Sequence, residues 1–213
     1  MGCDDKGNVF IGIPAATKQQ QVLCRFDSPI RLPPHQYIVA SGYSIKPSVY
    51  AEFTVAVNEP GRHGAVSYSG KTHVKLRINK YCKSTASKHR VDLSNIFKSD
   101  KRYQMEDGRC RPILLLDSDG GPDWNCKFEG TQNNWIQFAV EHDLDFFALG
   151  HHPGGCSPEG RQERRMAPLT KDLVALILPH SKYGDALNKQ KKTVDVALEK
   201  RNLHYSQQMM ASI

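Results

Sequence analysis

The chain has 213 residues, a length that suits one domain with a sizeable core and requires no disulfide or structural metal for folding. No run approaches the roughly 18 apolar residues of a membrane span, and the first five residues lack the basic-then-apolar pattern of a secretory signal. We therefore expect a soluble intracellular protein and not a membrane-spanning or secreted one. Its net charge of +7 favours a polyanionic partner.

The first half of the chain carries short strand patterns and one helical pattern. The expected strands cover, in chain order, residues 1–5, 9–13, 48–57 and 72–78. Lys6-Gly7-Asn8 is a tight-turn signal between the first two strands. Residues 14–47, rich in proline and glutamine, are expected to form a long and partly irregular connection. Residues 84–98 fit a helix.

The second half alternates strands and helices. A continuous apolar strand is expected over residues 111–116, and because its apolarity is unbroken it is expected to be buried on both faces. An amphipathic helix over residues 131–142, a buried strand over residues 144–149, a helix from Ser157-Pro158 towards Leu178 and a basic helix over residues 185–201 follow. This order predicts a mixed α/β sheet flanked by helices, with a core at residues 1–181 and a basic helical tail at residues 182–213.

Three acidic residues stand at the ends of the expected elements. Asp4 ends the first strand, Asp119 follows the apolar central strand, and Glu163 lies in the first turns of a late helix. Carboxylates placed at strand ends can converge at one edge of a sheet and hold Mg²⁺ together with a substrate phosphate. Two such ions about 4 Å apart activate an attacking hydroxyl and stabilise the leaving oxygen of a phosphodiester.

Each acidic residue also has a structural explanation. Asp117, Asp119 and Asp123 lie in a Gly-Pro turn, where aspartate is common because it hydrogen-bonds its own backbone. Glu163 fits the positive N-terminal end of a helix, and Asp4-Asp5 fits a solvated hairpin. Spacing alone therefore leaves the metal-binding and the structural interpretations open.

The motif order resembles that of the DDE/D transposases and retroviral integrases, and it is mariner-like in its arrangement. Asp4-Asp5-Lys6 resembles the first-aspartate segment, residues 116–122 (LDSDGGP) the second, and residues 151–163 (HHPGGCSPEGRQE) the loop and Ser-Pro turn before the third acid. The segments DSDGGPDWN and QERRMAPLTKDLVALILPH also resemble a group of transposon-derived proteins. The resemblance is strong over residues 112–181 and weaker over residues 1–60.

This resemblance implies a ribonuclease H-like fold that binds Mg²⁺ or Mn²⁺ through Asp4, Asp119 and Glu163, with Asp5 and Asp117 as alternatives to the first two. It implies DNA cleavage and strand transfer by a nuclear protein, and such enzymes often act as homodimers. Only three residues precede Asp4, and no helix-turn-helix domain precedes the core. The expectation is therefore a fragment, a degenerate copy or a reading frame that lacks its start.

Basic residues supply the candidate DNA contacts. Residues 71–102 contain ten Lys or Arg and two acids, which indicates either a phosphate-binding surface or an ordinary solvated face. The candidate nucleic-acid-binding residues are Arg161, Arg164, Arg165, Lys75 and Arg77.

Three alternative functions stay open. The chain can be a catalytically dead DNA-binding descendant of a transposase, or a ribonuclease H-like nuclease that acts on hybrids. A zinc-stabilised domain built from Cys82, Cys110, Cys126 and His151 or His152 is the third, although six cysteines without a CxxC pair favour dispersed free thiols.

Overall fold

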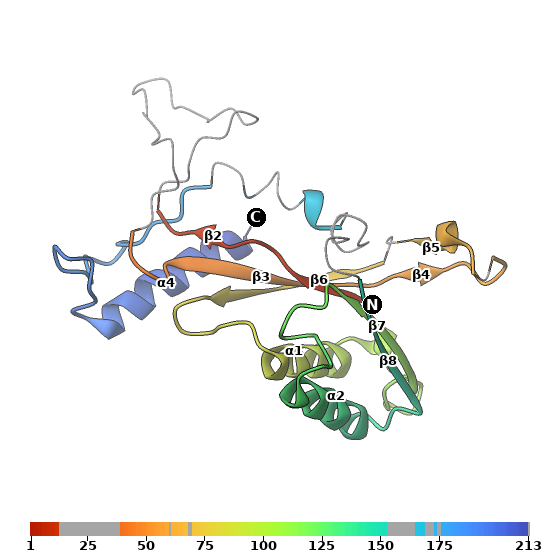
Figure 1. Cartoon of the computed structure of the whole chain (residues 1–213). Coiled ribbons are helices and arrows are strands. Elements are labelled where there is room, and N and C mark those ends of the chain that lie inside the picture. Colours follow the sequence, from red (N-terminus) through yellow and green to blue (C-terminus); the bar gives the residue numbers. More distant parts are fainter. Residues whose placement is uncertain are drawn as a thin grey trace. The chain divides into compact units, whose positions relative to one another are not determined.

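The computed structural model describes residues 1–12, 39–59, 61–67, 70–152, 165–168, 173 and 176–212 (Figure 1). The chain divides into two compact units. Unit 1 comprises Met1–Lys6, Ser48–Lys75 and Ser84–Met166, and unit 2 comprises Gly7–Pro47, Leu76–Lys83 and Ala167–Ile213. Within the described ranges, no helix is long and apolar enough to cross a bilayer.

A mixed sheet forms the framework of unit 1. Strand β1 (Gly2–Asp5) pairs antiparallel with β3 (Ser44–Ala51) on one side and parallel with β7 (Ile113–Ser118) on the other. Strand β7 pairs parallel with β8 (Phe146–His151), and β6 (Thr72–Ile78) pairs with β3. The remaining short elements are β4 (Thr54–Val55), β5 (Val66–Ser67), and the 3-10 helices η1 (His63–Ala65) and η2 (Lys101–Tyr103).

Two helices pack against one face of this sheet (Figure 1). Helix α1 (Ala86–Ser99) begins after Thr85, whose hydroxyl accepts a hydrogen bond from the Lys88 amide at 3.3 Å. Helix α2 (Glu129–Glu141) connects β7 to β8. The expected helices over residues 84–98 and 131–142 and the expected strand over residues 72–78 are confirmed.

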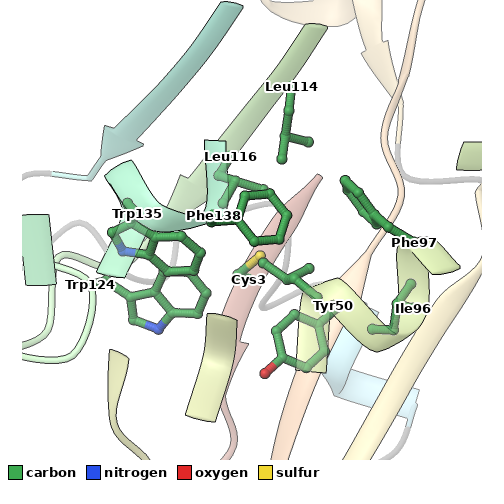
Figure 2. Packing of buried hydrophobic residues seen from close by; sticks show 10 residues of the cluster. Cys3, Tyr50, Ile96, Phe97, Leu114, Leu116, Trp124, Trp135 and Phe138 are labelled. Carbon is green, nitrogen blue, oxygen red and sulfur yellow. The ribbon is translucent and has the colours of Figure 1, made fainter. Parts of the chain in front are cut away.

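The core of unit 1 lies between the sheet and these helices (Figure 2). Trp124 and Trp135 stack with their ring centroids 5.1 Å apart, and Phe138 meets Trp135 edge to face. Cys3 of β1 points into the same cluster. Both tryptophans are therefore core residues, as the sequence pattern indicates, and are not exposed platforms for stacking bases.

The expectation that the strand at residues 111–116 is buried on both faces was wrong, and the strand at residues 144–149 is not fully buried as expected. Leu114 and Leu116 face the helices and are buried, but Ile113 is 64% exposed and Leu115 is 56% exposed. Phe146, which pairs with Ile113, is also exposed. Side chains alternate along a strand, and α1 and α2 pack on one face of the sheet only. The unbroken apolar run in β7 therefore did not indicate burial of both faces.

Unit 2 is built around the last helix. Strand β2 (Val9–Phe10) pairs antiparallel with β3, and Gly12 bridges to Leu178. Helix α4 (Val196–Ala211) contributes Leu203 and Met210 to a core cluster that also contains Tyr43 and Ile45. β1 and β2 were expected to be joined by a tight turn; instead, both pair with β3 in succession.

The expected helix over residues 185–201 is displaced in the structure. Asp195 caps α4 by accepting a hydrogen bond from the Leu198 amide at 2.9 Å, so the helix starts at Val196. Before it, Leu187 and Thr193 form an isolated bridge in a turn-rich segment. The local capping interaction, and not the run of lysines, sets the start of the helix. The expected helix from Ser157-Pro158 and most of the connection at residues 14–47 lie outside the described residues.

A buried carboxylate organises unit 2. Glu199 accepts hydrogen bonds from Tyr43 at 2.6 Å, from Lys80 at 2.6 Å, from Thr193 at 2.7 Å and from Tyr81. Burial by itself raises the pKa of Glu199, but these hydrogen bonds outweigh it and lower the pKa to about 2. Glu199 is therefore ionised in the folded protein and links α4 to the segment that follows β6.

Candidate functional site

The carboxyl ends of three parallel strands in unit 1 carry the acidic and histidine side chains. The β1–β7 pairing aligns Gly2 with Asp117 and Cys3 with Ser118, and the β7–β8 pairing aligns Ser118 with His151. The three strands therefore end at the same edge of the sheet. Candidate ligands leave this edge on both faces, because successive side chains alternate.

Asp4 leaves the edge on the face opposite α1 and α2, and Asp119 is the first residue after β7. Each follows one residue after the aligned pair Cys3 and Ser118, so the two aspartates occupy neighbouring positions. Asp4 is buried, and its Oδ1 accepts a hydrogen bond from the Asp5 amide at 2.7 Å. Oδ1 of Asp119 accepts one from the Gly121 amide at 2.9 Å. These backbone contacts fix the orientation of both carboxylates.

Asp117 lies on the same face but has a histidine partner. Its Oδ2 lies 3.1 Å from Nε2 of His152, the first residue after β8. On the helix-covered face, Ser118 Oγ lies 2.8 Å from Nδ1 of His151. Burial lowers the pKa of His151 and outweighs the nearby carboxylates of Asp119 and Asp117, which raise it. His151 is therefore expected to be neutral at pH 7.

A second group gathers on the helix-covered face around His89, in the first turn of α1. Its Nε2 lies 3.0 Å from Oδ2 of Asp123 and 4.0 Å from Oδ1 of Asp5. One ligand atom from each of the three residues lies within 4.8 Å of the others. This arrangement can hold a metal ion. Asp5 reaches it from β1, and Asp123 from the turn after β7.

Neighbouring side chains hold the His89 ring in place. Nδ1 lies 2.8 Å from the Tyr50 hydroxyl, and Nε2 lies 2.8 Å from the Ser84 hydroxyl. The ring packs against Trp124 with their centroids 4.4 Å apart. The core of unit 1 therefore positions the only imidazole of this group.

Gly121 lies between the two sets of carboxylates. A Cβ atom at this position would lie 3.1 Å from Oδ1 of Asp123 and 3.3 Å from Oδ1 of Asp119. Its neighbour Gly120 has a φ of +75°, a conformation that favours glycine. The Gly-Gly pair therefore lets both aspartates approach the same stretch of backbone.

The remaining residues expected to act at the site are placed differently. Glu163, Arg161 and Arg164 lie outside the described residues. Arg165 donates hydrogen bonds to Thr72 Oγ1 at 2.9 Å and to the Gly70 carbonyl, so it binds the start of β6. Arg77 is buried, and Lys75 is half-buried.

At least five of the ten basic residues at positions 71–102 form ion pairs. Their carboxylate partners are Asp100, Glu141, Glu199 and Glu52. The basic residues in these pairs are Lys71, Lys80, Arg90, Lys98 and Arg102. The positive charge of this segment is therefore smaller than the sequence count suggests.

The thiols do not form the alternative zinc site within the described part of the chain. Cys3, Cys82, Cys110 and Cys126 are free, and the one group there with metal-binding geometry is Asp5, His89 and Asp123. Cys110 Sγ lies 3.1 Å from Nδ1 of His142, but burial raises the pKa of this thiol. The pair therefore lacks the activated thiolate that a nucleophilic cysteine requires.

Sequence reasoning missed His89 and treated Asp123 only as a turn residue. His89 lies within the expected helix at residues 84–98, and no local motif marks it as a ligand. Asp5 was considered only as an alternative to Asp4. Strand alternation could have shown that Asp4 and Asp5 leave β1 on opposite faces, but the residue that Asp5 meets depends on tertiary packing.

Comparisons of the chain with protein-family models, with curated proteins and with solved structures gave no match. Support for a function therefore comes from the geometry of the sheet edge in unit 1 and from the motifs of the sequence.

Proposed function

We propose that this chain carries out metal-dependent cleavage and strand transfer of DNA, in the manner of a DDE/D transposase or integrase. A ribonuclease H-like identity of the mixed sheet, Mg²⁺ or Mn²⁺ as cofactor, a nuclear location and a homodimeric state belong to the same proposal. The motif resemblance at residues 112–181 motivates it, and the sheet edge supplies its geometric support.

The parallel register of β1 and β7 carries the argument. It aligns Cys3 with Ser118, so Asp4 and Asp119 each follow an aligned residue at the same edge of the sheet. Carboxylate oxygens are the ligands that Mg²⁺ prefers. Asp119 is favoured over Asp117, since the Asp117 carboxylate already contacts His152.

In this proposal Asp4 and Asp119 position the metal, and Glu163 supplies a third carboxylate. A bound divalent cation lowers the charge on a scissile phosphate and helps to generate the attacking hydroxide or 3′-hydroxyl. Gly120 and Gly121 leave room beside Asp119 for a phosphate to approach. Arg161 and Arg164 would contact the DNA backbone beside Glu163.

The test is cleavage of supercoiled plasmid and of short duplex DNA in Mg²⁺ or Mn²⁺ by wild type and Asp119→Asn. The substitution removes several kcal/mol of transition-state stabilisation, so the rate is expected to fall about 100-fold or more. The matched control is Asp107→Asn, because this aspartate is exposed and its carboxylate pairs with the guanidinium of the nearby Arg109 at 2.8 Å. Equal cleavage by Asp119→Asn and wild type would contradict the proposal.

Two other outcomes would favour different functions. Salt-sensitive DNA binding without cleavage, unaffected by divalent metal, would favour a catalytically dead DNA-binding descendant. Cleavage of RNA–DNA hybrids without joining of DNA ends would favour a ribonuclease H-like nuclease.

A further inference from the structure

We propose that Asp5, His89 and Asp123 form a separate binding site for a divalent transition cation, for which Zn²⁺ and Co²⁺ are the appropriate probes. This site lies on the helix-covered face of the sheet. Asp4 leaves β1 on the opposite face, because Asp4 and Asp5 are consecutive in the strand. The inference does not depend on the proposed DNA chemistry.

The spacing of the three groups fits a metal without rearrangement of the backbone. Tetrahedral Zn²⁺ with bonds of about 2.0–2.1 Å places its ligand atoms about 3.3 Å apart. The His89 Nε2 atom lies 3.0 Å from Asp123 Oδ2 and 4.0 Å from Asp5 Oδ1. These two distances lie on either side of the ideal value, so small side-chain rotations bring the atoms to bonding positions.

The hydrogen bonds of Tyr50 set the tautomer of His89. The Tyr50 hydroxyl donates its single proton to Oδ2 of Asp92 at 2.9 Å, so towards Nδ1 of His89, 2.8 Å away, it acts as an acceptor. Nδ1 therefore carries the proton in the neutral ring, and Nε2 presents its lone pair to the carboxylates. Metal-binding histidines are commonly oriented in this way, by an acceptor on their other nitrogen.

A proton or a metal ion between Nε2 and Asp123 would stabilise their close approach. The neutral Nε2 and a carboxylate oxygen are both electron-rich, and at 3.0 Å they repel each other. The Ser84 hydroxyl can donate to Nε2, but it cannot also bridge Nε2 to Asp123. Either a proton on Nε2 or a metal ion satisfies this geometry, and the experiment below distinguishes the two.

The donor atoms select the kind of ion. One imidazole nitrogen with two carboxylate oxygens suits Zn²⁺, Co²⁺ or Mn²⁺, whereas Mg²⁺ prefers oxygen ligands alone. His89 is fully buried, while the side chains of Asp5 and Asp123 are 14% and 23% exposed. The bound ion would therefore keep a position open to water on the carboxylate side, as in zinc sites with three protein ligands.

The experiment titrates the purified full chain with Co²⁺, then displaces it with Zn²⁺ and challenges it with excess Mg²⁺. We expect one Co²⁺ per chain, with visible absorption of nitrogen and oxygen coordination and without the charge-transfer band of a thiolate. Zn²⁺ is expected to displace it, and Mg²⁺ is not. His89→Gln and Asp123→Asn are each expected to weaken binding about 100-fold, and Tyr50→Phe about 10- to 100-fold.

The matched control is His142→Gln. His142 is also a buried histidine of unit 1, with Nε2 2.8 Å from Ser94 Oγ, and its loss should leave Co²⁺ affinity unchanged. Circular dichroism establishes whether each variant is folded. If His89→Gln unfolds, Asp123→Asn tests the site instead, because it preserves the shape of a partly exposed side chain. Absence of Co²⁺ and Zn²⁺ binding by folded wild type, or a thiolate band, would overturn the proposal in favour of a proton on Nε2 or a cysteine site. Asp119→Asn should abolish DNA cleavage while keeping Co²⁺ binding, so the two proposals fail independently.

Discussion

Replacement of Glu199 by glutamine is expected to destabilise unit 2 strongly. The carboxylate is fully buried, and Lys80 binds it with a side chain that is only 26% exposed. Glu199→Gln keeps the shape of the side chain but leaves the Lys80 ammonium without its countercharge. Removing one partner of a buried pair costs about 3–5 kcal/mol, so a loss of that order is expected at pH 7.

The pH dependence gives a second estimate of the same interaction. Hydrogen bonds to the ionised carboxylate lower the Glu199 pKa from 4.5 to about 2 against the opposing effect of burial. At about 1.4 kcal/mol per pKa unit, this shift corresponds to about 3 kcal/mol. Because the folded-state pKa lies below the unfolded value, the stabilisation is complete above about pH 4.5 and is lost as the pH falls towards 2.

The assay is urea unfolding followed by far-ultraviolet circular dichroism, together with hydrogen exchange of the amides in α4. The control is Glu141→Gln, whose carboxylate is 34% exposed and pairs with Lys98 at 2.7 Å, and it should cost no more than about 1 kcal/mol. Equal stability losses in the two variants, or an unchanged pH dependence in Glu199→Gln, would refute the role assigned to burial and countercharge.

Two further predictions concern the sheet edge. In Gly121→Ala the new Cβ would lie 3.1 Å from Asp123 Oδ1 and 3.3 Å from Asp119 Oδ1, so both carboxylates must move. The affinity for divalent metal, measured by titration, should therefore fall about tenfold or more. Unchanged affinity would show that neither carboxylate position matters for metal binding. Burial lowers the pKa of His151, so its ring should titrate by NMR below about 6.5 and, because the unfolded chain takes up that proton first, its contribution should reduce stability as the pH falls through this region. A midpoint above that value would contradict the burial argument.

Local patterns predicted several elements well. The strand at Thr72–Ile78 has the expected bounds, and α1 and α2 begin and end within two residues of the expected helices. These segments carry their own signals, because a polar cap or a regular apolar spacing is contained within one stretch of chain. α4 starts later than expected because Asp195 caps it, whereas the basic run before Asp195 is not helical.

Burial and pairing depended on partners that are distant in the sequence. Ile113 and Leu115 have the same apolar character as Leu114 and Leu116, yet only the latter two meet the helices. Arg77 was a candidate nucleic-acid-binding residue, yet its side chain is buried. A strand pattern specifies two faces, but it does not specify which of them the next helix covers.

The sequence by itself determined that the chain combines strands with helices and that aspartates follow its apolar strands, because these properties are local. Only the tertiary structure decided which face of the sheet α1 and α2 cover, and that His89 from α1 meets Asp5 and Asp123. Local backbone preferences fix the face of a strand or helix on which a side chain lies. The register between β1 and β7 and the packing of α1 on the sheet fix which other side chains it meets.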